Sequence, residues 1–491
     1  MRRARHSSRR LRPHLAKQFR SASLAPFASW PGPRLPLFAP VSFCLAGLAV
    51  LLGLFVPIVR IPEARAELLF PCLQSSECPP GTRCNWGLCE DSLFDVGAPL
   101  FQVSVLDMPD LSTSSGTRGL RERLAEAFAQ ALRQSGTFSA VRHGGAYPVD
   151  TLTLFKALDK GSAYVLSARL VTYDGSTGQV KISLVDAQSG AEVEPLGRVL
   201  ALDADNPVKA AEEWVNAAVL YFTGRPGVLG VRLAVVRKME QGVKEVFVLT
   251  YGRDDMRQIT FDRTLSMLPA WTHDGRLAWT SYRDGAQKVV LEGLKDPFCA
   301  FEGLNSGIVW SRDGSTAAVT LSKDGDPDIY LLVGTTGEEL ARLTFSPGID
   351  TSPSWSPTGT DLAFVSDREG TPQIFTMRAS GEEQKRVTFA GFYNTSPNWH
   401  PFGPYVVYSS QLSTYQIFRL DLRTGETVQL TSGSGDSEDP EWSPDGRLIA
   451  YAYGRGKRQD IYVMNADGSN PRRLTSDEGP YYTPAWEILL R

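Results

Sequence analysis

Several features on which enzymes and membrane proteins depend are scarce or absent in this sequence. No Gly-x-Ser-x-Gly motif occurs, so the chain lacks the nucleophile elbow of serine hydrolases. Five histidines are present, and two of them, His6 and His14, lie in the basic N-terminal segment. No segment after residue 66 is apolar enough to span a membrane. We therefore expect neither a serine-peptidase domain nor a membrane span beyond that point.

Positive charge is also scarce outside the N-terminal segment. The chain has 51 Lys and Arg and 54 Asp and Glu, of which eleven basic residues and one acidic residue lie in residues 1–66. The remainder has 40 basic and 53 acidic residues, a net charge of about −13. This balance argues against nucleic acid as a partner.

No sequence motif indicates a cofactor or a resident metal ion. Gly144-Gly145 and Gly116-x-x-Gly119 lack the spacing and the Lys of a phosphate-binding loop. The segment "DGDPD" (324–328) does not have the acid spacing of an EF-hand. We interpret it as a hairpin turn, with a calcium site as the alternative.

Residues 1–66 have the order of an export signal. A long basic start precedes the apolar run "VSFCLAGLAVLLGLFVPIV" (41–59), and Ala64-Arg65-Ala66 follows as a small-residue cleavage site. The sequence therefore predicts a cleaved signal peptide and a periplasmic mature chain. A retained anchor is the alternative, because 19 apolar residues can span a bilayer.

Residues 67–95 contain four of the six cysteines. In an exported chain, this density predicts two disulfides that hold together a small module, and zinc is the alternative. No Cys-x-x-Cys pair is present, which favours disulfides, and three pairings are open. The four cysteines are Cys72, Cys78, Cys84 and Cys89. Cys299 remains, and we expect it to be buried.

Residues 96–226 are predicted to form a small α/β domain. "FQVSVLDM" (101–108) has the character of a strand. Residues 117–138 have Leu120, Leu124, Phe128 and Leu132 at a spacing of four, which is one apolar face of a helix. Two alternating runs between residues 162 and 190 predict a hairpin, and residues 208–224 predict a second helix.

A tryptophan recurs through the rest of the chain at nearly constant spacing. Successive copies stand 39, 45, 44, 43 and 44 residues apart, and most begin phrases such as "WSPDG". The copies are Trp271, Trp310, Trp355, Trp399, Trp442 and Trp486. A fixed period of this size indicates stacked supersecondary units rather than six copies of a binding site.

Other elements of the repeat keep the same period. A β-type pair such as Ile329-Tyr330 follows four of the six Trp, and an apolar residue with Thr, such as Leu343-Thr344, follows each of those pairs. Four short strands in about 44 residues form one propeller blade. We expect a mainly β protein whose residues 227–491 form a six-bladed β-propeller, with the C-terminal strand completing the first blade. Each Trp is expected to begin a strand and to fill the space between blades, and His273 and His400 are expected to be turn residues.

These phrases resemble the TolB family of the Tol-Pal system over roughly residues 96–491. "YFTGRPGV", "SKDGDPDIYLL", "SDREGTPQIFTM", "RVTFAGFYNTSPNW" and the final "TPAW" have the order found in that family. The resemblance implies a non-enzymatic periplasmic scaffold that supports outer-membrane integrity and envelope constriction during division. A propeller hydrolase or a small-ligand-binding propeller is the alternative.

The resemblance also implies partners. It predicts binding to the peptidoglycan-associated lipoprotein, Pal, and contact of the mature N-terminus with a TolA-like inner-membrane protein. Because the Cys-rich module occupies that N-terminal position here, we expect the TolA contact to be altered or absent.

The residues just ahead of each Trp-led strand are predicted to form the Pal-binding mouth of the channel. Thr351 matches a Pal-facing Thr of the family, whereas Leu304 and Gly307 stand where the family has a His and an Ala. The full predicted set is Leu304, Asn305, Gly307, Asp350, Thr351, Asn394, Thr395, Glu438, Asp439, Tyr481 and Tyr482.

Overall fold

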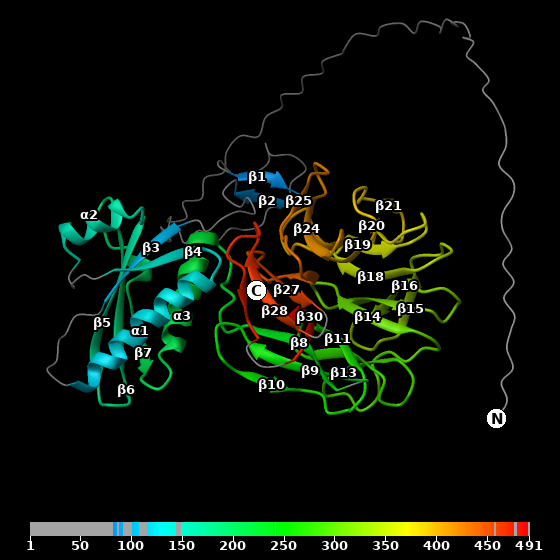
Figure 1. Cartoon of the computed structure of the whole chain (residues 1–491), viewed down its shortest axis with the longest axis horizontal. Helices are drawn as coiled ribbons and strands as arrows, with labels where there is room; N and C mark the ends of the chain where they lie inside the picture. Colours follow the sequence, from blue (N-terminus) through cyan, green and yellow to red (C-terminus); the bar gives the residue numbers. More distant parts are fainter. Residues whose placement is uncertain are drawn as a thin grey trace, which may run out of the picture. The chain divides into compact units, whose positions relative to one another are not determined.

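The computed structural model describes residues 82–85, 88–91, 101–107, 115–143, 149–240, 242–455, 458–475 and 479–489 (Figure 1). The side chains of residues 82–91 and 115–118 are outside this description. So are the predicted signal peptide (1–66), Cys72 and Cys78. Within the described residues, no helix is long and apolar enough to cross a membrane.

Of the predicted Cys-rich module, the structure describes one short β-hairpin. Strand β1 (Thr82–Asn85) pairs antiparallel with β2 (Leu88–Asp91), and Cys84 is directly opposite Cys89 in the register. Only the backbone of these two cysteines is described, so the two-disulfide arrangement stays a prediction.

The α/β domain contains a five-stranded mixed sheet with the order β4-β3-β5-β6-β7. Its strands are β3 (Phe101–Leu106), β4 (Phe138–His143), β5 (Tyr164–Tyr173), β6 (Thr177–Asp186) and β7 (Arg198–Asp203). Its helices are α1 (Ser115–Gln134), α2 (Thr151–Asp159) and α3 (Val208–Thr223), with a short 3-10 turn at Glu194–Leu196. The expected strand at 101–108, both helices and the hairpin are confirmed, while α2, β4 and β7 were not predicted.

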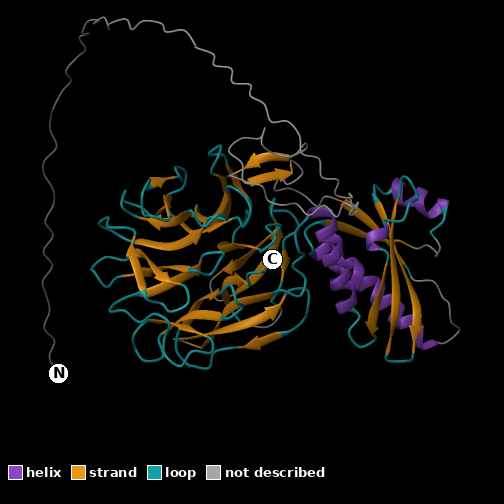
Figure 2. Ribbon diagram, turned by 180° about the vertical axis from the view of Figure 1, so that it is seen from behind, coloured by secondary structure: helices purple, strands orange, loops and turns teal. Residues whose placement is uncertain are grey.

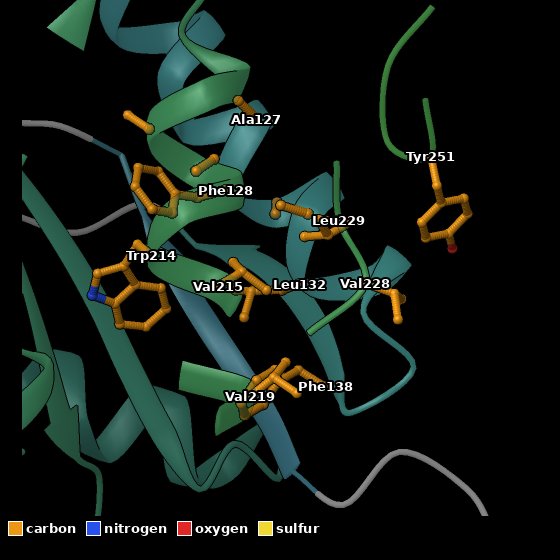
Figure 3. Close-up of a cluster of buried hydrophobic side chains, with 14 of the residues drawn as sticks. Ala127, Phe128, Leu132, Phe138, Trp214, Val215, Val219, Val228, Leu229 and Tyr251 are labelled. Atoms are coloured by element: carbon orange, nitrogen blue, oxygen red, sulfur yellow. The ribbon is translucent and has the colours of Figure 1, made fainter. Parts of the chain in front are cut away.

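Helices α1 and α3 pack side by side on one face of this sheet. Phe128 and Leu132 of α1 are fully buried and lie beside Trp214 and Val215 of α3, as Figure 3 shows, and Leu124 of α1 belongs to the same buried cluster. Helix α2 covers the other face, because it packs on residues of β3 and β5 that alternate with those facing α1.

The second region is the propeller, and the described strands form six sheets arranged in a ring (Figure 2). Blade 1 has β8 (Arg232–Glu240), β9 (Val243–Thr250), β10 (Met256–Gln258) and β30 (Tyr481–Trp486). Blade 2 has β11 (Ser266–Trp271), β12 (Leu277–Ser281) and β13 (Lys288–Leu291). Blade 3 has β14 (Asn305–Trp310), β15 (Thr316–Leu321), β16 (Asp328–Val333) and β17 (Glu339–Arg342).

The remaining blades repeat the same meander. Blade 4 has β18 (Asp350–Trp355), β19 (Asp361–Ser366), β20 (Gln373–Arg378) and β21 (Lys385–Arg386). Blade 5 has β22 (Asn394–Trp399), β23 (Tyr405–Gln411), β24 (Tyr415–Asp421) and β25 (Thr427–Gln429). Blade 6 has β26 (Asp436–Trp442), β27 (Leu448–Arg455), β28 (Arg458–Asn465) and β29 (Arg472–Arg473).

The ring closes as the sequence predicted. Strand β30 pairs antiparallel with β8, so the C-terminal strand becomes the inner strand of the first blade. This pairing joins residues 244 to 253 positions apart, such as Tyr481 with Arg237 and Trp486 with Leu233, and removes the exposed sheet edges of an open array. In blade 2, Cys299 follows β13 in the chain and forms an isolated antiparallel β-bridge with Val289 of that strand. Cys299 is buried, as expected.

One expectation about the Trp repeat is wrong. The Trp does not begin a strand but is the last residue of the innermost strand of each blade. The reason is the phrase that follows it, because residues such as Ser-Pro-Asp-Gly form the turn that ends this strand. The expected packing is confirmed: Trp399 contacts Ala363 and Val365 of blade 4 and Val406 of its own blade.

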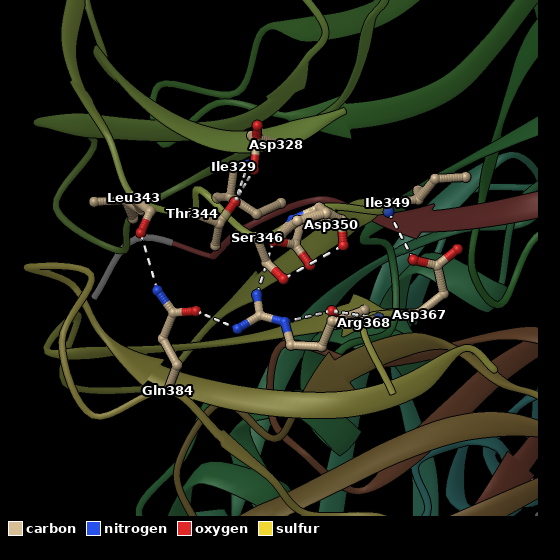
Figure 4. A network of polar contacts seen from close by, with 12 residues as sticks. Asp328, Ile329, Leu343, Thr344, Ser346, Ile349, Asp350, Asp367, Arg368 and Gln384 are labelled. Carbon is tan, nitrogen blue, oxygen red and sulfur yellow. Dashed lines mark hydrogen bonds and ion pairs between the residues drawn. The ribbon is translucent and has the colours of Figure 1, made fainter. Parts of the chain in front are cut away.

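A hydrogen-bond pattern explains the repeated Thr. In blade 3, the N–H of Ile329 donates to Thr344 Oγ1 at 2.9 Å, and Thr344 Oγ1 donates to Asp328 Oδ1 at 2.9 Å (Figure 4). Blades 1, 4, 5 and 6 repeat the arrangement with Thr260, Thr388, Thr431 and Thr475. Each Thr therefore ties the end of its outer strand to the third strand of the same blade.

Candidate functional site

The six inner strands surround a central channel. Each inner strand contacts the inner strands of both neighbouring blades, including β11 with β30 across the closure. We number the last six residues of each strand from first position to sixth, and the sixth is the Trp. A cavity of about 410 Å³ lies among these strands. Its lining extends from the third position, and in blades 3 and 4 from the second position (Ser306 and Thr351), to the turns after the Trp. We call the channel end where the inner strands begin the strand-start mouth, and the other end the Trp mouth.

The third position of every inner strand has left-handed backbone. The φ angles lie between 41° and 63°, and a register shift follows in each strand. The six residues are Leu268, Gly307, Ser352, Ser396, Asp439 and Thr483. Left-handed backbone costs about 1–2 kcal/mol for a residue with a Cβ. The ring therefore keeps a strained bulge in five blades where glycine is absent, and this bulge turns the neighbouring side chains toward the channel.

Carboxylates are confined to one side of the channel wall. At the second, third and fifth positions, blade 6 has Glu438, Asp439 and Glu441, and the other five inner strands have no acid there. Loss of solvation raises the pKa of Glu438 and of Asp439, and it raises the pKa of Glu441 to about 8. The wall is thus chemically asymmetric although its backbone repeats.

The fifth position joins neighbouring blades. Ser354 Oγ accepts the N–H of Trp399 at 2.9 Å, and Asn398 Oδ1 accepts the N–H of Trp442 at 2.9 Å. Glu441 Oε1 accepts the N–H of Trp486 at 3.2 Å in the equivalent place. Glu441 therefore takes part in the same inter-blade contact as two uncharged residues.

The first position of each inner strand is buried rather than presented to a partner. Asn305, Asp350, Asn394 and Tyr481, all in the predicted set, are each at most 1% exposed. Asn394 donates to Ala390 O at 2.8 Å and to Gln373 Oε1 at 2.7 Å. Asp350 pairs with Arg368 at 2.8 Å (Figure 4). Asn305, through Phe301 and Gly303, and Asn394, through Ala390, therefore hold the loops that lead into their strands.

The other predicted residues are partly exposed. The second-position residues of this group, Thr351, Thr395, Glu438 and Tyr482, lie at the strand-start end of the channel wall. Three members of the group, Gly307, Thr351 and Asp439, line the cavity. Thr351 Oγ1 lies 3.3 Å from Thr320 Oγ1 of blade 3. The partly exposed set is Leu304, Gly307, Thr351, Thr395, Glu438, Asp439 and Tyr482.

The Trp mouth is crossed by side chains from different blades. Arg312 of blade 3 donates through Nη1 to Pro401 O of blade 5 at 2.9 Å, and both residues line the cavity. The ring of Phe402 lies 4.8 Å from the Arg312 guanidinium carbon and 4.0 Å from that of Arg225. Arg312 therefore links blades 3 and 5 across the Trp mouth.

The two propeller histidines pack in turns, as expected. A Cβ on Gly314 would lie 2.0 Å from His273 Nδ1, and a Cβ on Gly446 would lie 2.3 Å from His400 Nε2. Burial and the charge of Arg225 lower the pKa of His400 to about 3. Each imidazole therefore packs directly against the turn glycine of the next blade and leaves no room there for a Cβ.

The "DGDPD" segment also serves a structural purpose. It connects β15 with β16, where Asp324 Oδ2 accepts the Tyr330 hydroxyl at 2.7 Å and Asp328 pairs with Arg342 at 2.6 Å. Among the described residues, no group of three or more potential metal ligands is present.

Two kinds of residue on the inner strands and on the loops that lead into them were not identified from the sequence. One is Glu441, which stands next to a repeat Trp where other blades have uncharged residues. The other is a set of exposed aromatic residues, including Phe345 and Phe389, each of which follows a repeat Thr. Aligning the repeats could have revealed them, because the equivalent residue is Ser432 in blade 5 and Ser476 in blade 6.

Known proteins share the sequence and the fold of this chain. The PD40 family, described as the TolB beta propeller domain, matches residues 220–490. The Protein TolB homolog of Chlorobium luteolum is 34% identical over 319 residues, which are 64% of this chain and 72% of that protein. The Tol-Pal system protein TolB of Bordetella pertussis is 34% identical over 276 residues, 55% of this chain and 63% of that protein. The chain thus spans less than two thirds of the Bordetella relative.

A solved structure agrees with the architecture. The crystal structure of TolB from Acinetobacter baumannii matches with a TM-score of 0.67 at 24% sequence identity, covering 80% of this chain and 97% of that one. At this identity the likeness shows the fold. Together with the match of the family model to more than half of the sequence, these comparisons show that the chain belongs to the TolB beta-propeller family.

Proposed function

We propose that this protein is a periplasmic, non-enzymatic interaction scaffold of the Tol-Pal type. In this role it supports outer-membrane integrity and envelope constriction during division. The observation that carries the proposal is the strand-start mouth. There, partly exposed second-position residues such as Thr351 and Thr395 stand on inner strands whose first positions are buried and hydrogen-bonded. A rigid mouth of this kind suits docking of a folded partner.

The chemistry of the buried reactive groups supports a role without catalysis. The pKa of His400 is lowered to about 3, so this imidazole stays neutral near pH 7 and is held against Gly446 O at 3.1 Å. Burial raises the pKa of the Cys299 thiol to about 12, which keeps the sulfur in its unreactive protonated form.

The proposed principal partner is a Pal-type peptidoglycan-associated lipoprotein. Export by the predicted signal peptide would bring the chain to the periplasm, where such a lipoprotein is found. A contact with a TolA-like protein is expected to be altered, because the mature N-terminus contains the Cys-rich segment instead of a simple tail.

The test is calorimetric titration of the mature chain with the purified Pal-type domain of the same organism. We expect Thr351→Arg with Thr395→Arg to weaken binding at least tenfold, because two bulky cations would stand on the mouth. Both positions are partly exposed, so circular dichroism should show an intact fold. Wild-type protein that does not bind would exclude the partner, and unchanged affinity of the double variant would exclude the mouth.

The cavity favours a second candidate, a propeller that binds a small ligand. Its volume of about 410 Å³ lies within the range of small-molecule pockets. If this is the function, filling the cavity by Ser352→Phe should abolish ligand-induced stabilisation of the wild type in a screen of periplasmic metabolites.

A further inference from the structure

Two of the four cysteines that precede the α/β domain in the chain stand opposite each other in the structure. In the hairpin of β1 and β2, Cys84 is the register partner of Cys89, and Asn85 is the partner of Leu88. Two residues, 86 and 87, separate these strands in the chain. The sequence leaves three pairings of the four cysteines open, and this register distinguishes among them.

The place of this pair in the ladder suits a disulfide. Asn85 and Leu88 flank a two-residue loop, and in a turn of this length the first residue typically accepts the N–H of the fourth. Pairs alternate along an antiparallel ladder, so Cys84 and Cys89 occupy the next, non-hydrogen-bonded site, where opposite Cα atoms are about 4.5 Å apart. A disulfide joins residues whose Cα atoms are roughly 4.4–6.8 Å apart, so the site lies within the required range.

The other two pairings enclose longer stretches of chain. With Cys84 joined to Cys89 and Cys72 joined to Cys78, the two disulfides enclose four and five residues. Each of the other pairings includes a disulfide that encloses eleven residues or more. The entropy cost of loop closure rises with loop length, and a hairpin forms in roughly 1–10 μs. The hairpin therefore favours the local pairing when the reduced chain is first oxidised.

The two remaining cysteines do not compete for these partners. Cys44 lies in the predicted signal peptide. Cys299 is a free, buried thiol in blade 2, and its Sγ donates to Asn305 Oδ1 at 3.2 Å. Burial raises the pKa of Cys299 to about 12, so this sulfur stays protonated near pH 7 and does not attack a disulfide.

We propose that Cys84 and Cys89 form a disulfide across the hairpin, and that Cys72 and Cys78 form the second disulfide of residues 67–95. This inference rests on the export that is part of the proposed function, because disulfides persist in an oxidising compartment. Each disulfide is then local. The hairpin and the residues ahead of it are joined by the backbone alone, rather than cross-linked into one knot.

The oxidant is a disulfide of a thiol oxidoreductase in that compartment. One thiolate of the hairpin attacks a sulfur of this donor, forms a mixed disulfide and releases one donor thiolate. The second hairpin thiolate attacks the sulfur of the first, which forms the Cys84–Cys89 bond and releases the other donor thiolate. The two hairpin thiols thus lose two protons and two electrons, and the donor disulfide becomes a dithiol.

Peptide mapping without a reductant tests the pairing, because one trypsin site separates the two pairs. Free thiols of the mature chain are first labelled with N-ethylmaleimide under denaturing conditions. Cleavage after Arg83 then gives peptide 67–83, with Cys72 and Cys78, and peptide 84–118, with Cys84 and Cys89. We expect two separate, unlabelled peptides, each two hydrogens lighter than its dithiol form. The internal control is peptide 296–312, whose single cysteine should carry the label.

Two preparations separate the pairing from the proposed export. One is the chain isolated from the cell envelope, and the other is the purified mature chain, reduced and then reoxidised with glutathione disulfide. The same two closed peptides in both preparations would support the proposal. Closed peptides in the reoxidised chain only, with four labelled cysteines in the chain from cells, would support the pairing and contradict the export.

Two matched variants identify the partner of each cysteine. Cys84→Ser should leave one labelled thiol in peptide 84–118, and Cys72→Ser should leave one in peptide 67–83. In either of the other pairings, the label would appear on the opposite peptide in each variant. Peptides 67–83 and 84–118 joined by a disulfide would overturn the proposal. Four labelled cysteines in the reoxidised chain, or four thiols that retain zinc through purification, would also overturn it.

Discussion

The inner strands of blades 4 and 6 have the same backbone and different chemistry. In β18 and β26 the third of the last six residues is left-handed, with φ of 54° at Ser352 and 51° at Asp439, and both strands end in the repeat Trp. Blade 4 presents hydroxyl groups at the second, third and fifth positions, whereas blade 6 presents three carboxylates whose pKa values are raised by loss of solvation.

This difference separates scaffold from site. The bulge, the terminal Trp and the turn glycine are determined by how one blade packs on the next, so they recur in chemically different blades. The second, third and fifth side chains face the channel, where the packing allows different residues. Substitutions in matched positions of blades 4 and 6 can test this separation, beginning with the largest expected effect.

The turn glycines should differ most. The turn glycines Gly446 of blade 6 and Gly359 of blade 4 have similar φ angles, +74° and +70°. Their surroundings differ. A Cβ at Gly446 would lie 2.3 Å from His400 Nε2, whereas a Cβ at Gly359 would have no atom of the described residues within 4 Å. We expect Gly446→Ala to lower the free energy of unfolding by about 3–5 kcal/mol, as backbone strain adds to overpacking. Gly359→Ala should cost about 1–2 kcal/mol.

Calorimetric melting of both variants measures this contrast. Equal melting temperatures for Gly446→Ala and Gly359→Ala would show that the packing of His400 against Gly446 does not add to the cost of a Cβ in this turn.

The first positions should differ next. Asp350 is 1% exposed and paired with Arg368, so Asp350→Ala leaves a guanidinium without its carboxylate and should cost about 2–4 kcal/mol. Ser437, the equivalent residue in blade 6, is buried with no partner for its hydroxyl among the described residues. Ser437→Ala should be neutral or slightly stabilising. Urea unfolding provides the comparison, and a large loss in Ser437→Ala would contradict it.

The third contrast depends on pH and concerns the fifth positions. The pKa of Glu441 is about 8 in the folded protein against 4.5 as its ordinary value. Between these pH values the folded state keeps a proton that the unfolded state releases, so the free energy of unfolding falls as pH rises through this window. Glu441→Gln keeps an acceptor for the Trp486 N–H and removes the titration. We expect its melting temperature to exceed that of the wild type by about 4 °C at pH 8.5.

The matching substitution in blade 4 is Ser354→Ala, which removes the uncharged acceptor of the Trp399 N–H. It should lower the melting temperature by the same amount at pH 5 and at pH 8.5. A Glu441→Gln effect that is equally independent of pH would show that the carboxyl group titrates as an ordinary surface acid.

Much of the fold could be predicted from repeated residues. The Trp period predicted six blades, the paired Ile and Thr predicted strands, and the final "TPAW" predicted ring closure through β30. The helical spacing of Leu120 to Leu132 predicted α1. Helix α2 was missed because its nine residues are too few for a repeated apolar spacing to stand out, and two of its large apolar side chains, Leu152 and Phe155, are exposed.

The candidate site was less accessible to sequence reasoning. The segments ahead of each Trp could be located by the period, but four of the eleven chosen positions, Asn305, Asp350, Asn394 and Tyr481, are buried. Their polar or aromatic character suggested surface residues. The groups that bury Asp350 and Asn394 come from turns and strands 18 to 21 residues away, such as Arg368 and Gln373, and no local pattern identifies them.

The sequence by itself determined the number of blades, the strand that closes the ring and the location of the loops, because each of these follows from residues that recur at a fixed spacing. Only the tertiary structure decided which residues of those loops remain in solvent. Burial of these residues depends on contacts with groups 18 to 21 residues away, in the same or the preceding blade, and the same loop can cover Asn394 and leave Phe392 exposed.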